Sequence, residues 1–342
     1  MAKSIVDRLL ASDEASIRWR TRVGVLGEDP DKPANRRLRN GIRTSPAARR
    51  LIDGHARMQP KTYSKWRGGH WVLMALADLG YPPGDEELAP MRDGVLRTWL
   101  GGHYYREFDA DAGPRAGPPR ASGVVVVNGR YRQCGSLQGG ALLGIVRLGI
   151  DDGRAADLVE RLRHWQWPDG GWNCDRDPDA RSSSVYETLI PMRGLAAYAS
   201  RSAGRSTDRQ EAARASRRAA EVLLTRRLLF RRSTGEVIRG DWVKLHFPVY
   251  WHYDVLAALK GIAEAGLIDD PRCADGLDLL ERKQLPTGGW AAEAKFYEPP
   301  DADRGTRDHV DWGGVDRGRM NEWVTVDALT VLAAAGRLPA RA

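Results

Sequence analysis

Two histidines, one aspartate and several aromatic residues crowd the segment from His246 to Asp254. Imidazole and carboxylate side chains are common general acids and bases in enzymes. We expect this segment to open an apolar helix, on which each residue advances by about 100°. His252 and Asp254 then point about 200° apart. One of them is therefore expected to face a substrate, while the other is expected to contact the outer layer of helices.

A second group of acids lies near the C-terminus, where Asn321 and Glu322 precede Asp327. Asp327 falls inside an apolar run, where a carboxylate must be paired or must carry a raised pKa. A carboxylic acid with a raised pKa can act as a general acid. The structural alternative is an ion pair with a base such as Arg193 or Lys260.

Two further candidates lie between the first glycine-rich turn and the helix expected after it. Cys174 and Asp175 can bind zinc, for which we consider His252 as the third ligand. The alternative is a small buried cysteine and a turn-forming aspartate. Glu187 is expected at the inner rim of a cavity, although it also follows Ser184 at the spacing of a capping box.

Aromatic residues fall close to the expected starts of the apolar helices. Aromatic faces can stabilise carbocations by roughly 0.5–2 kcal/mol each, and ordinary packing between helices is the alternative. The expected substrate-binding residues are Trp66, Trp71, Tyr186, Trp251, Trp323, His246 and Asn321.

Stretches that are apolar on nearly all sides alternate with stretches that carry one charged face. The first kind is typical of a helix buried on both sides, and the second of a helix between core and solvent. Apolar stretches are expected at 66–80, 136–149, 183–199, 249–266 and 320–336, and charged ones at 85–99, 154–166, 208–229 and 271–284. A first pair at 5–10 and 15–26 and an outer helix at 33–55 complete about six helical hairpins.

Inner helices that pack side by side, each backed by an outer helix, would close into an (α/α)6 toroid. We therefore predict an all-α chain with one domain over residues 1–342. An open solenoid is the competing architecture, and closure is favoured because the terminal pairs show no polar capping face. Mobile insertions are expected at 103–123 and 291–319, and Asn128-Gly129 predicts a β-hairpin over 124–131.

An internal repeat joins the two kinds of stretch. Gln166-Trp167-Pro168-Asp169-Gly170-Gly171-Trp172 matches Gln284-Leu285-Pro286-Thr287-Gly288-Gly289-Trp290. Proline disfavours helix at the residue before it, the glycines allow a tight turn, and the tryptophan can bury a large apolar face. Each copy therefore predicts the end of one helix and a turn into the next.

These two copies resemble the QW repeats of squalene-hopene and oxidosqualene cyclases and the related repeats of protein prenyltransferase β subunits. With the alternation of helices, the resemblance covers the chain from about Lys65 to Gly336. It implies an (α/α)6 barrel of the terpenoid-cyclase and protein-prenyltransferase superfamily. It also implies a cavity lined by inner helices that takes an isoprenoid or similar apolar substrate.

The catalytic motifs of that superfamily are absent from this sequence. The cyclases that protonate an alkene use Asp-x-Asp-Asp, which does not occur here, and Asp151-Asp152 and Asp269-Asp270 lack the third aspartate of Asp-Asp-x-x-Asp. The prenyltransferases bind zinc with an Asp-x-Cys pair and a histidine, and no Asp-x-Cys occurs either. The resemblance therefore implies a scaffold rather than a particular reaction.

Composition indicates the partners and the cellular compartment to expect for this protein. The chain has 342 residues and a formal net charge of +8, but basic residues are mixed with acidic ones, so we expect no nucleic-acid partner. Three cysteines cannot all pair and fit a reducing cytoplasm. No apolar run near the N-terminus or elsewhere suits a signal peptide or a membrane span. We expect a cytoplasmic protein that can also contact a membrane peripherally.

Three functions follow from these residues. The leading hypothesis is an enzyme that processes an isoprenoid or other apolar substrate by acid–base, carbocation chemistry, with Asp254, Glu322 or Asp327 moving the proton. The second is a zinc-dependent transferase similar to the prenyltransferases. The third is a binding scaffold without catalysis, since the family's motifs are missing.

Overall fold

The computed structural model describes residues 4–56, 64, 66–109, 123–201, 204–297 and 310–338. Most of these residues lie in helices, and only three short strands are found among them, so the predicted dominance of helices is confirmed. Parts of the expected insertions at 103–123 and 291–319 lie outside the described residues.

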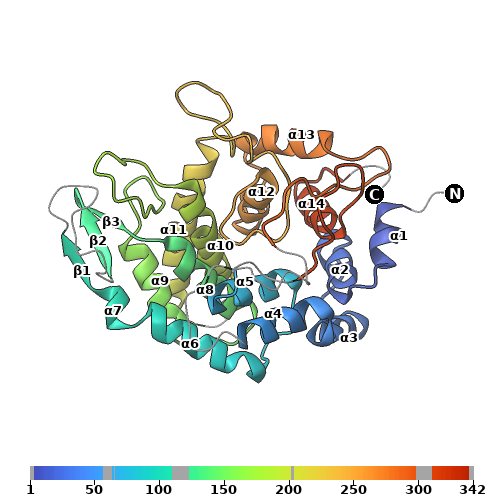
Figure 1. The fold of residues 1–342 in the computed structure, drawn as a ribbon, viewed down its shortest axis with the longest axis horizontal. Helices are drawn as coiled ribbons and strands as arrows, with labels where there is room; N and C mark the ends of the chain where they lie inside the picture. Colours follow the sequence, from blue (N-terminus) through green and yellow to red (C-terminus); the bar gives the residue numbers. More distant parts are fainter. Residues whose placement is uncertain are drawn as a thin grey trace.

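Six largely buried helices follow one another through the structure. They are α2 (Ala15–Arg20, extended by a π-helical turn, Thr21–Val25), α5 (Gly69–Leu79), α8 (Gly135–Arg147), α10 (Val185–Ser200), α12 (Val255–Glu264) and α14 (Glu322–Ala334). Each of them contacts the next along the chain, and α14 contacts α2 again. The contacts among the six helices therefore run through a complete circuit (Figure 1).

The remaining helices pack against this circuit and expose one face, with one exception. They are α1 (Ile5–Leu10), α3 (Pro33–Gly41), α4 (Pro46–Ala56), α6 (Ala89–Trp99), the short α7 (Gly102–Tyr105), α9 (Ala155–His164), α11 (Ser206–Leu224) and α13 (Ala274–Arg282). The exception is the short α7, which contacts α6. Short 3₁₀ turns cover Ile42–Thr44, Glu86–Leu88 and Pro271–Cys273. In Figure 1, α1, α3, α6, α9 and α13 lie along the periphery of the molecule.

Three expected helices have clearly different limits in the structure. The stretch 208–229 is helical only to the end of α11 at Leu224, because Arg227 and Leu228 have positive φ. The stretch 33–55 is divided into α3 and α4, since Ser45 is extended and Pro46 opens a new helix with its fixed φ. The helix expected from residue 249 begins only at Val255, because the extended Asp254 is its N-cap. Tyr250 has a φ of +47°, outside the helical region. The expected helical geometry of residues 249–254 is therefore wrong.

The two repeats adopt the same local structure. Each buried tryptophan donates from its indole to a backbone carbonyl ten residues earlier, Trp172 to Leu162 at 2.9 Å and Trp290 to Leu280 at 2.7 Å. The positive φ expected of the turn is found at Gly170, which has a φ of +102°. In each repeat, the tryptophan after the turn is thus bonded back to the outer helix before the turn, α9 or α13.

Small residues bring α5, α8 and α10 unusually close together. A Cβ atom on Gly139 of α8 would lie 2.6 Å from the backbone of Pro191 in α10, and one on Gly144 would lie 2.6 Å from Leu73 of α5. Glycine at these positions allows the helix backbones to approach each other directly. These contacts fix the spacing between three of the buried helices.

The predicted β-hairpin is confirmed. Strands β2 (Val124–Val127) and β3 (Arg130–Arg132) pair antiparallel, and β1 (Glu107–Asp109) pairs parallel with β2. Asn128 and Gly129 join the hairpin with φ of +50° and +68°, as a tight two-residue turn requires. The strand β3 leads directly into α8 and so positions the beginning of that helix.

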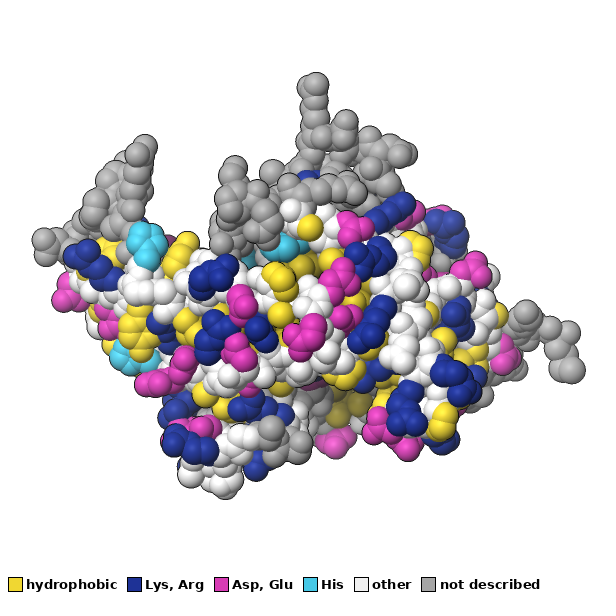
Figure 2. Space-filling model, turned by 90° about the horizontal axis from the view of Figure 1, so that it is seen from below, with side chains coloured by type: hydrophobic (Ala, Val, Ile, Leu, Met, Phe, Trp, Pro, Cys, Tyr) yellow, Lys and Arg dark blue, Asp and Glu magenta, His cyan; other side chains and the backbone are white. Residues whose placement is uncertain are grey.

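Basic and acidic side chains are interspersed on the face of the molecule drawn in Figure 2. Among the described residues, no helix combines the length and apolar character that crossing a bilayer would require.

Candidate functional site

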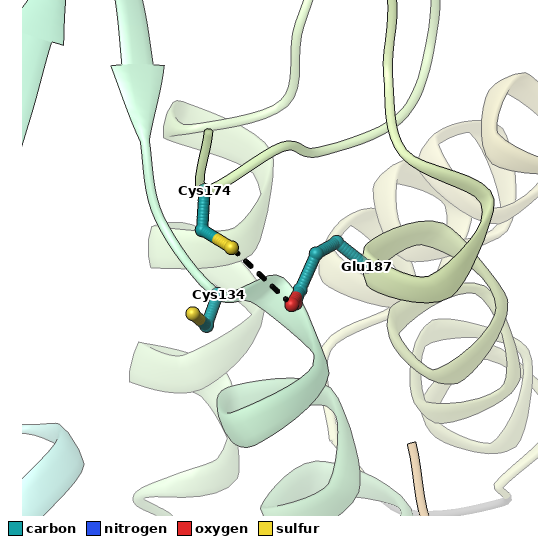
Figure 3. Close-up of side chains that lie close together, drawn as sticks. All are labelled: Cys134, Cys174 and Glu187. Atoms are coloured by element: carbon teal, nitrogen blue, oxygen red, sulfur yellow. Dashed lines mark hydrogen bonds between the residues drawn. The ribbon is translucent and has the colours of Figure 1, made fainter. Parts of the chain in front are cut away.

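Three potential metal ligands meet where α8 and α10 begin (Figure 3). Cys134 is the N-cap residue of α8, Cys174 lies in the loop after the first repeat, and Glu187 lies in the first turn of α10. One ligand atom from each of them lies within 4.8 Å of the others. Within the described parts of the chain, this is the one group of three or more such residues that could hold a metal ion.

Hydrogen bonds hold this group in place. One carboxylate oxygen of Glu187 accepts from the backbone amide of Ser136 at 3.0 Å, and the other accepts from the Cys174 thiol at 3.5 Å. The loop that carries Cys174 is tied to the entry of α8, since the Gln133 amide donates to the Asn173 carbonyl at 3.1 Å. The repeat turn and the hairpin therefore deliver the two cysteines to one place.

All three groups become negatively charged when they ionise. Burial raises the pKa of Glu187. The pKa of Cys134 is raised by its hydrogen bond with the Cys174 thiol, then by burial and by the charge of Glu187. The mutual repulsion of the three groups can be relieved by protons or by a cation.

This donor set suits zinc. Zinc binds thiolate sulfur and carboxylate oxygen, and catalytic zinc sites commonly use three protein ligands. The three side chains project from two helix starts and one anchored loop, so the fold itself positions them. A zinc ion held by Cys134, Cys174 and Glu187 would supply Lewis-acid chemistry at this point.

The structure corrects the predicted zinc set of Cys174, Asp175 and His252. Asp175 is exposed, and its carboxylate accepts from the backbone amide of Asp177 at 3.0 Å, which is the turn-forming role. The ring of His252 stacks on Phe296 with 3.4 Å between centroids. Cys174 therefore has Cys134 and Glu187 as its potential co-ligands instead.

The sequence reasoning missed Cys134. This residue stands directly before the apolar stretch 136–149, at the same kind of loop-to-helix junction that drew attention to Cys174. Applying that criterion to every junction would have identified it. The predicted capping box also differs, because the Ser184 side chain makes no cap and Glu187 instead bonds to the start of the neighbouring helix.

Three of the aromatic residues expected to bind substrate come together. The ring centroid of Trp251 lies 4.6 Å from that of Trp66 and 5.4 Å from that of Trp71. Trp66 and Trp71 belong to a second apolar cluster, separate from the main core. The buried members of this cluster are Trp66, Trp71, Met74, Leu143, Ile190, Ala197 and Tyr250.

Buried members of the second apolar cluster lie on the same helix as the candidate ligand Glu187. The residues of this cluster come from α5, α8, α10 and the segments before α5 and α12. Ile190 lies one turn after Glu187 on α10, and side chains three residues apart are neighbours on a helix. The candidate ligands and this cluster are therefore linked through the first two turns of α10.

Two other predicted aromatic residues pack elsewhere. Tyr186 lies edge-on to Trp242, and its hydroxyl accepts from the Trp242 indole at 2.9 Å. Trp323 stacks on Phe247 with 5.2 Å between centroids. Both contact the main core, so the structure separates them from the Trp66, Trp71 and Trp251 group.

Asp254 and His246 form a buried pair that begins α12. The His246 ring nitrogen Nδ1 lies 2.8 Å from the Asp254 carboxylate, and the two side chains are 2% and 1% exposed. The same carboxylate accepts from the backbone amides of His246 and Ala257, at 2.8 and 2.7 Å. The geometry gives Asp254 a capping role, which corrects its expected position facing a substrate.

The N-cap residue and the two predicted acids of α14 also have local partners. Asn321 is the N-cap of the helix and accepts from the Val324 amide at 3.1 Å. Glu322 accepts from the hydroxyl of Ser12 at 2.6 Å. Asp327 pairs with Arg20 and with Lys260, the latter at 2.9 Å, so the predicted structural alternative with Lys260 is found.

Asp327 belongs to an ion-pair network that joins all six buried helices. Asp78 of α5 pairs with Arg193 of α10 at 2.6 Å and with Lys260 of α12 at 3.4 Å. Arg193 also pairs with Glu264 at 2.6 Å. Arg147, the last residue of α8, reaches both Asp78 and Glu264, while Arg20 supplies the link to α2.

The residues of this network lie between the middle and the C-terminal end of their helices, whereas Cys134 and Glu187 lie at helix beginnings. Positive charge is favoured near helix C-terminal ends, and Arg20 and Arg147 provide it in the last turns of α2 and α8. The predicted acid Asp327 lies near the middle of α14 and belongs to this network rather than to the group of candidate ligands.

No protein-family model matches this chain, and no curated protein matches it significantly.

Proposed function

We propose that this chain is an (α/α)6 toroid of the terpenoid-cyclase and protein-prenyltransferase superfamily. Three observations support the proposal. The six buried helices contact one another in a complete circuit, each is accompanied by a partly exposed helix, and the two glycine-tryptophan repeats share one local structure. Small-angle scattering tests the closed shape against an extended solenoid, which would give a much longer maximum dimension.

Within this scaffold, we propose a zinc-dependent transferase that acts on an isoprenoid-type or other apolar substrate. The observation that carries the proposal is the meeting of Cys134, Cys174 and Glu187 within 4.8 Å. The set differs from the Asp-x-Cys pair and histidine of the prenyltransferases, so the resemblance supplies the scaffold and the local geometry supplies the site.

Different residues of the chain would bind the metal, contact the substrate and orient a ligand. Cys134, Cys174 and Glu187 would hold the zinc ion, which when bound can lower the pKa of a nucleophile or polarise an oxygen. Trp66, Trp71 and Trp251 offer apolar faces to the substrate and exclude water from it. Ser136 orients the carboxylate of Glu187 through its backbone amide.

Elemental analysis of the purified full-length protein tests the metal. We expect one zinc per chain, and we expect Cys134→Ser and Cys174→Ser to lose most of it. Cys273→Ser is the matched control, because Cys273 lies at the start of α13, apart from this group. A chain that purifies without stoichiometric metal and takes up none from added zinc would contradict the zinc proposal.

A fluorescent prenyl diphosphate analogue tests the substrate class. We expect saturable binding that weakens in Trp251→Ala, because Trp251 touches both other tryptophans and is only partly buried. Equal binding by Trp251→Ala and the wild-type protein would argue against this cluster as the substrate site.

Acid–base chemistry without a metal is the second candidate, and Glu187 is the acid that favours it. Asp254 and Asp327 are each held by buried basic partners, and Glu322 is bonded to Ser12. Glu187 lies at the candidate site itself. Glu187→Gln would abolish turnover under either candidate, whereas turnover by the wild-type protein that persists after a chelator removes all metal would favour the acid–base role.

A further inference from the structure

A cavity of about 300 Å³ with several charged lining residues lies at the opposite end of α8 from Cys134. Its wall is formed by α2 and its π-helical extension, α3, the ends of α5 and α8, and parts of α12 and α14. The charged and aromatic lining residues are Trp19, Arg20, Arg39, Asp78, Arg147, Lys260 and Asp327.

Three buried donors in this wall make no hydrogen bond to the described residues, and one of them, the Nζ of Lys260, is still ion-paired with Asp327 at 2.9 Å. The other two are the indole Nε1 of Trp19 and the Nη1 of Arg20. The Arg20 side chain is 9% exposed, and its other terminal nitrogen is bonded to Asp327. A buried donor without an acceptor costs free energy, so this wall is built to receive an acceptor from a ligand or from water.

The wall also carries an excess of positive charge. Arg20, Arg39, Arg147 and Lys260 face only two acids, Asp78 and Asp327, which leaves a formal charge of +2. The neighbouring pair of Arg193 and Glu264 cancels and does not alter this balance. Both acids are already paired, Asp327 with Arg20 and Lys260, and Asp78 with Arg193.

The Arg39 side chain in the cavity wall is held in one conformation by its neighbours. Its guanidinium lies 4.8 Å from the centroid of the Trp19 ring, and its Nε donates to the Gly80 carbonyl at 3.0 Å. Stacking and hydrogen bonding hold this positive charge beside the free indole donor of Trp19. Little side-chain ordering is then needed when an anion enters.

We propose that this cavity binds a small, doubly charged oxyanion, with Trp19 Nε1 and Arg20 Nη1 donating to it and Arg39 providing charge. The ligand chemistry is that of a phosphate or a small dicarboxylate. The site is separate from the candidate zinc site, so removal of zinc with a chelator leaves anion binding unchanged.

Calorimetric titration of the full-length protein with inorganic phosphate at constant ionic strength tests the proposal. We expect one saturable site per chain. Trp19→Phe keeps the ring beneath Arg39 but removes the donor, and should weaken binding about fivefold, as expected for one neutral hydrogen bond. Arg39→Met removes a charge from the wall and should weaken binding about tenfold.

Arg217→Met is the matched control, since Arg217 is exposed on α11 and lies outside this wall. We expect it to bind phosphate as the wild type does. Succinate titrated in parallel distinguishes the two ligand chemistries, and saturation by either one supports the site. The absence of saturation by both, or equal affinity in Trp19→Phe, Arg39→Met and Arg217→Met, would overturn the proposal. A crystal structure with water alone on Trp19 and Arg20 in saturating phosphate would do the same.

Discussion

The carboxylate of Glu187 in α10 accepts a hydrogen bond from the backbone amide of Ser136 in α8, at 3.0 Å. The first amides of a helix have no partner within that helix, and the Cys134 side chain does not supply one here. One helix thus caps its neighbour, and the same carboxylate belongs to the candidate metal site.

This relationship predicts an effect of Glu187 on stability. We expect Glu187→Ala to lower the free energy of unfolding by about 1–2 kcal/mol, as for the loss of a helix cap. Glu187→Gln retains a carbonyl acceptor and should lose less. Urea denaturation measures both, with Glu160→Ala as the control because Glu160 is exposed on α9. Equal losses for Ala and Gln would show that the hydrogen bond contributes little.

Asp254 should be among the most sensitive acids for stability. Asp254→Ala leaves His246 and two backbone amides without their buried acceptor. We expect a loss of about 3–5 kcal/mol in unfolding free energy, the range for breaking a buried pair. Asp269→Ala is the control, since Asp269 is exposed just before α13. Similar losses for both variants in thermal and urea unfolding would contradict the capping role of Asp254.

The ion-pair network predicts how stability depends on pH. Burial raises the pKa of Glu264, but the charges of Arg147 and Arg193 outweigh this effect and lower the pKa to about 2 from the ordinary 4.5. A carboxylate with a lowered pKa in the folded state contributes stability above its ordinary pKa and loses it as the pH falls.

We therefore expect the unfolding free energy to decrease between about pH 4.5 and pH 2. The network also lowers the pKa of Asp78, although burial alone would raise it, so its contribution is lost in the same direction. Urea titrations at several pH values measure the slope. Glu264→Gln should make it shallower, and an unchanged slope in that variant would rule out Glu264 as a contributor.

Alanine substitutions at two glycines with nearly equal φ can separate the cost of backbone strain from the cost of a steric clash. Gly170 and Gly153 have φ of +102° and +104°. A Cβ atom on Gly170 would lie 2.2 Å from the Arg218 carbonyl oxygen, whereas one on Gly153 would meet nothing within 4 Å. We expect Gly153→Ala to cost about 1–2 kcal/mol and Gly170→Ala to cost about 3 kcal/mol or more. Equal changes in melting temperature would refute the steric argument.

The helical alternation and the repeat turns could be read from the sequence because both are local signals. A helix buried on both sides must be apolar all round, and a turn with positive φ favours glycine. The stretches at 136–149 and 183–199 therefore correspond closely to α8 and α10. The β-hairpin at Asn128-Gly129 follows from the same kind of local rule.

The partners of the polar groups were decided by the tertiary structure. Cys134 and Cys174 are forty residues apart, and nothing local relates them until the repeat turn and the hairpin bring their loops together. Asp254 had the residue type of a catalyst, but its extended backbone made it a helix cap. Periodicity fixes which face of a segment avoids water, whereas meeting points between distant segments depend on how whole helices pack against one another.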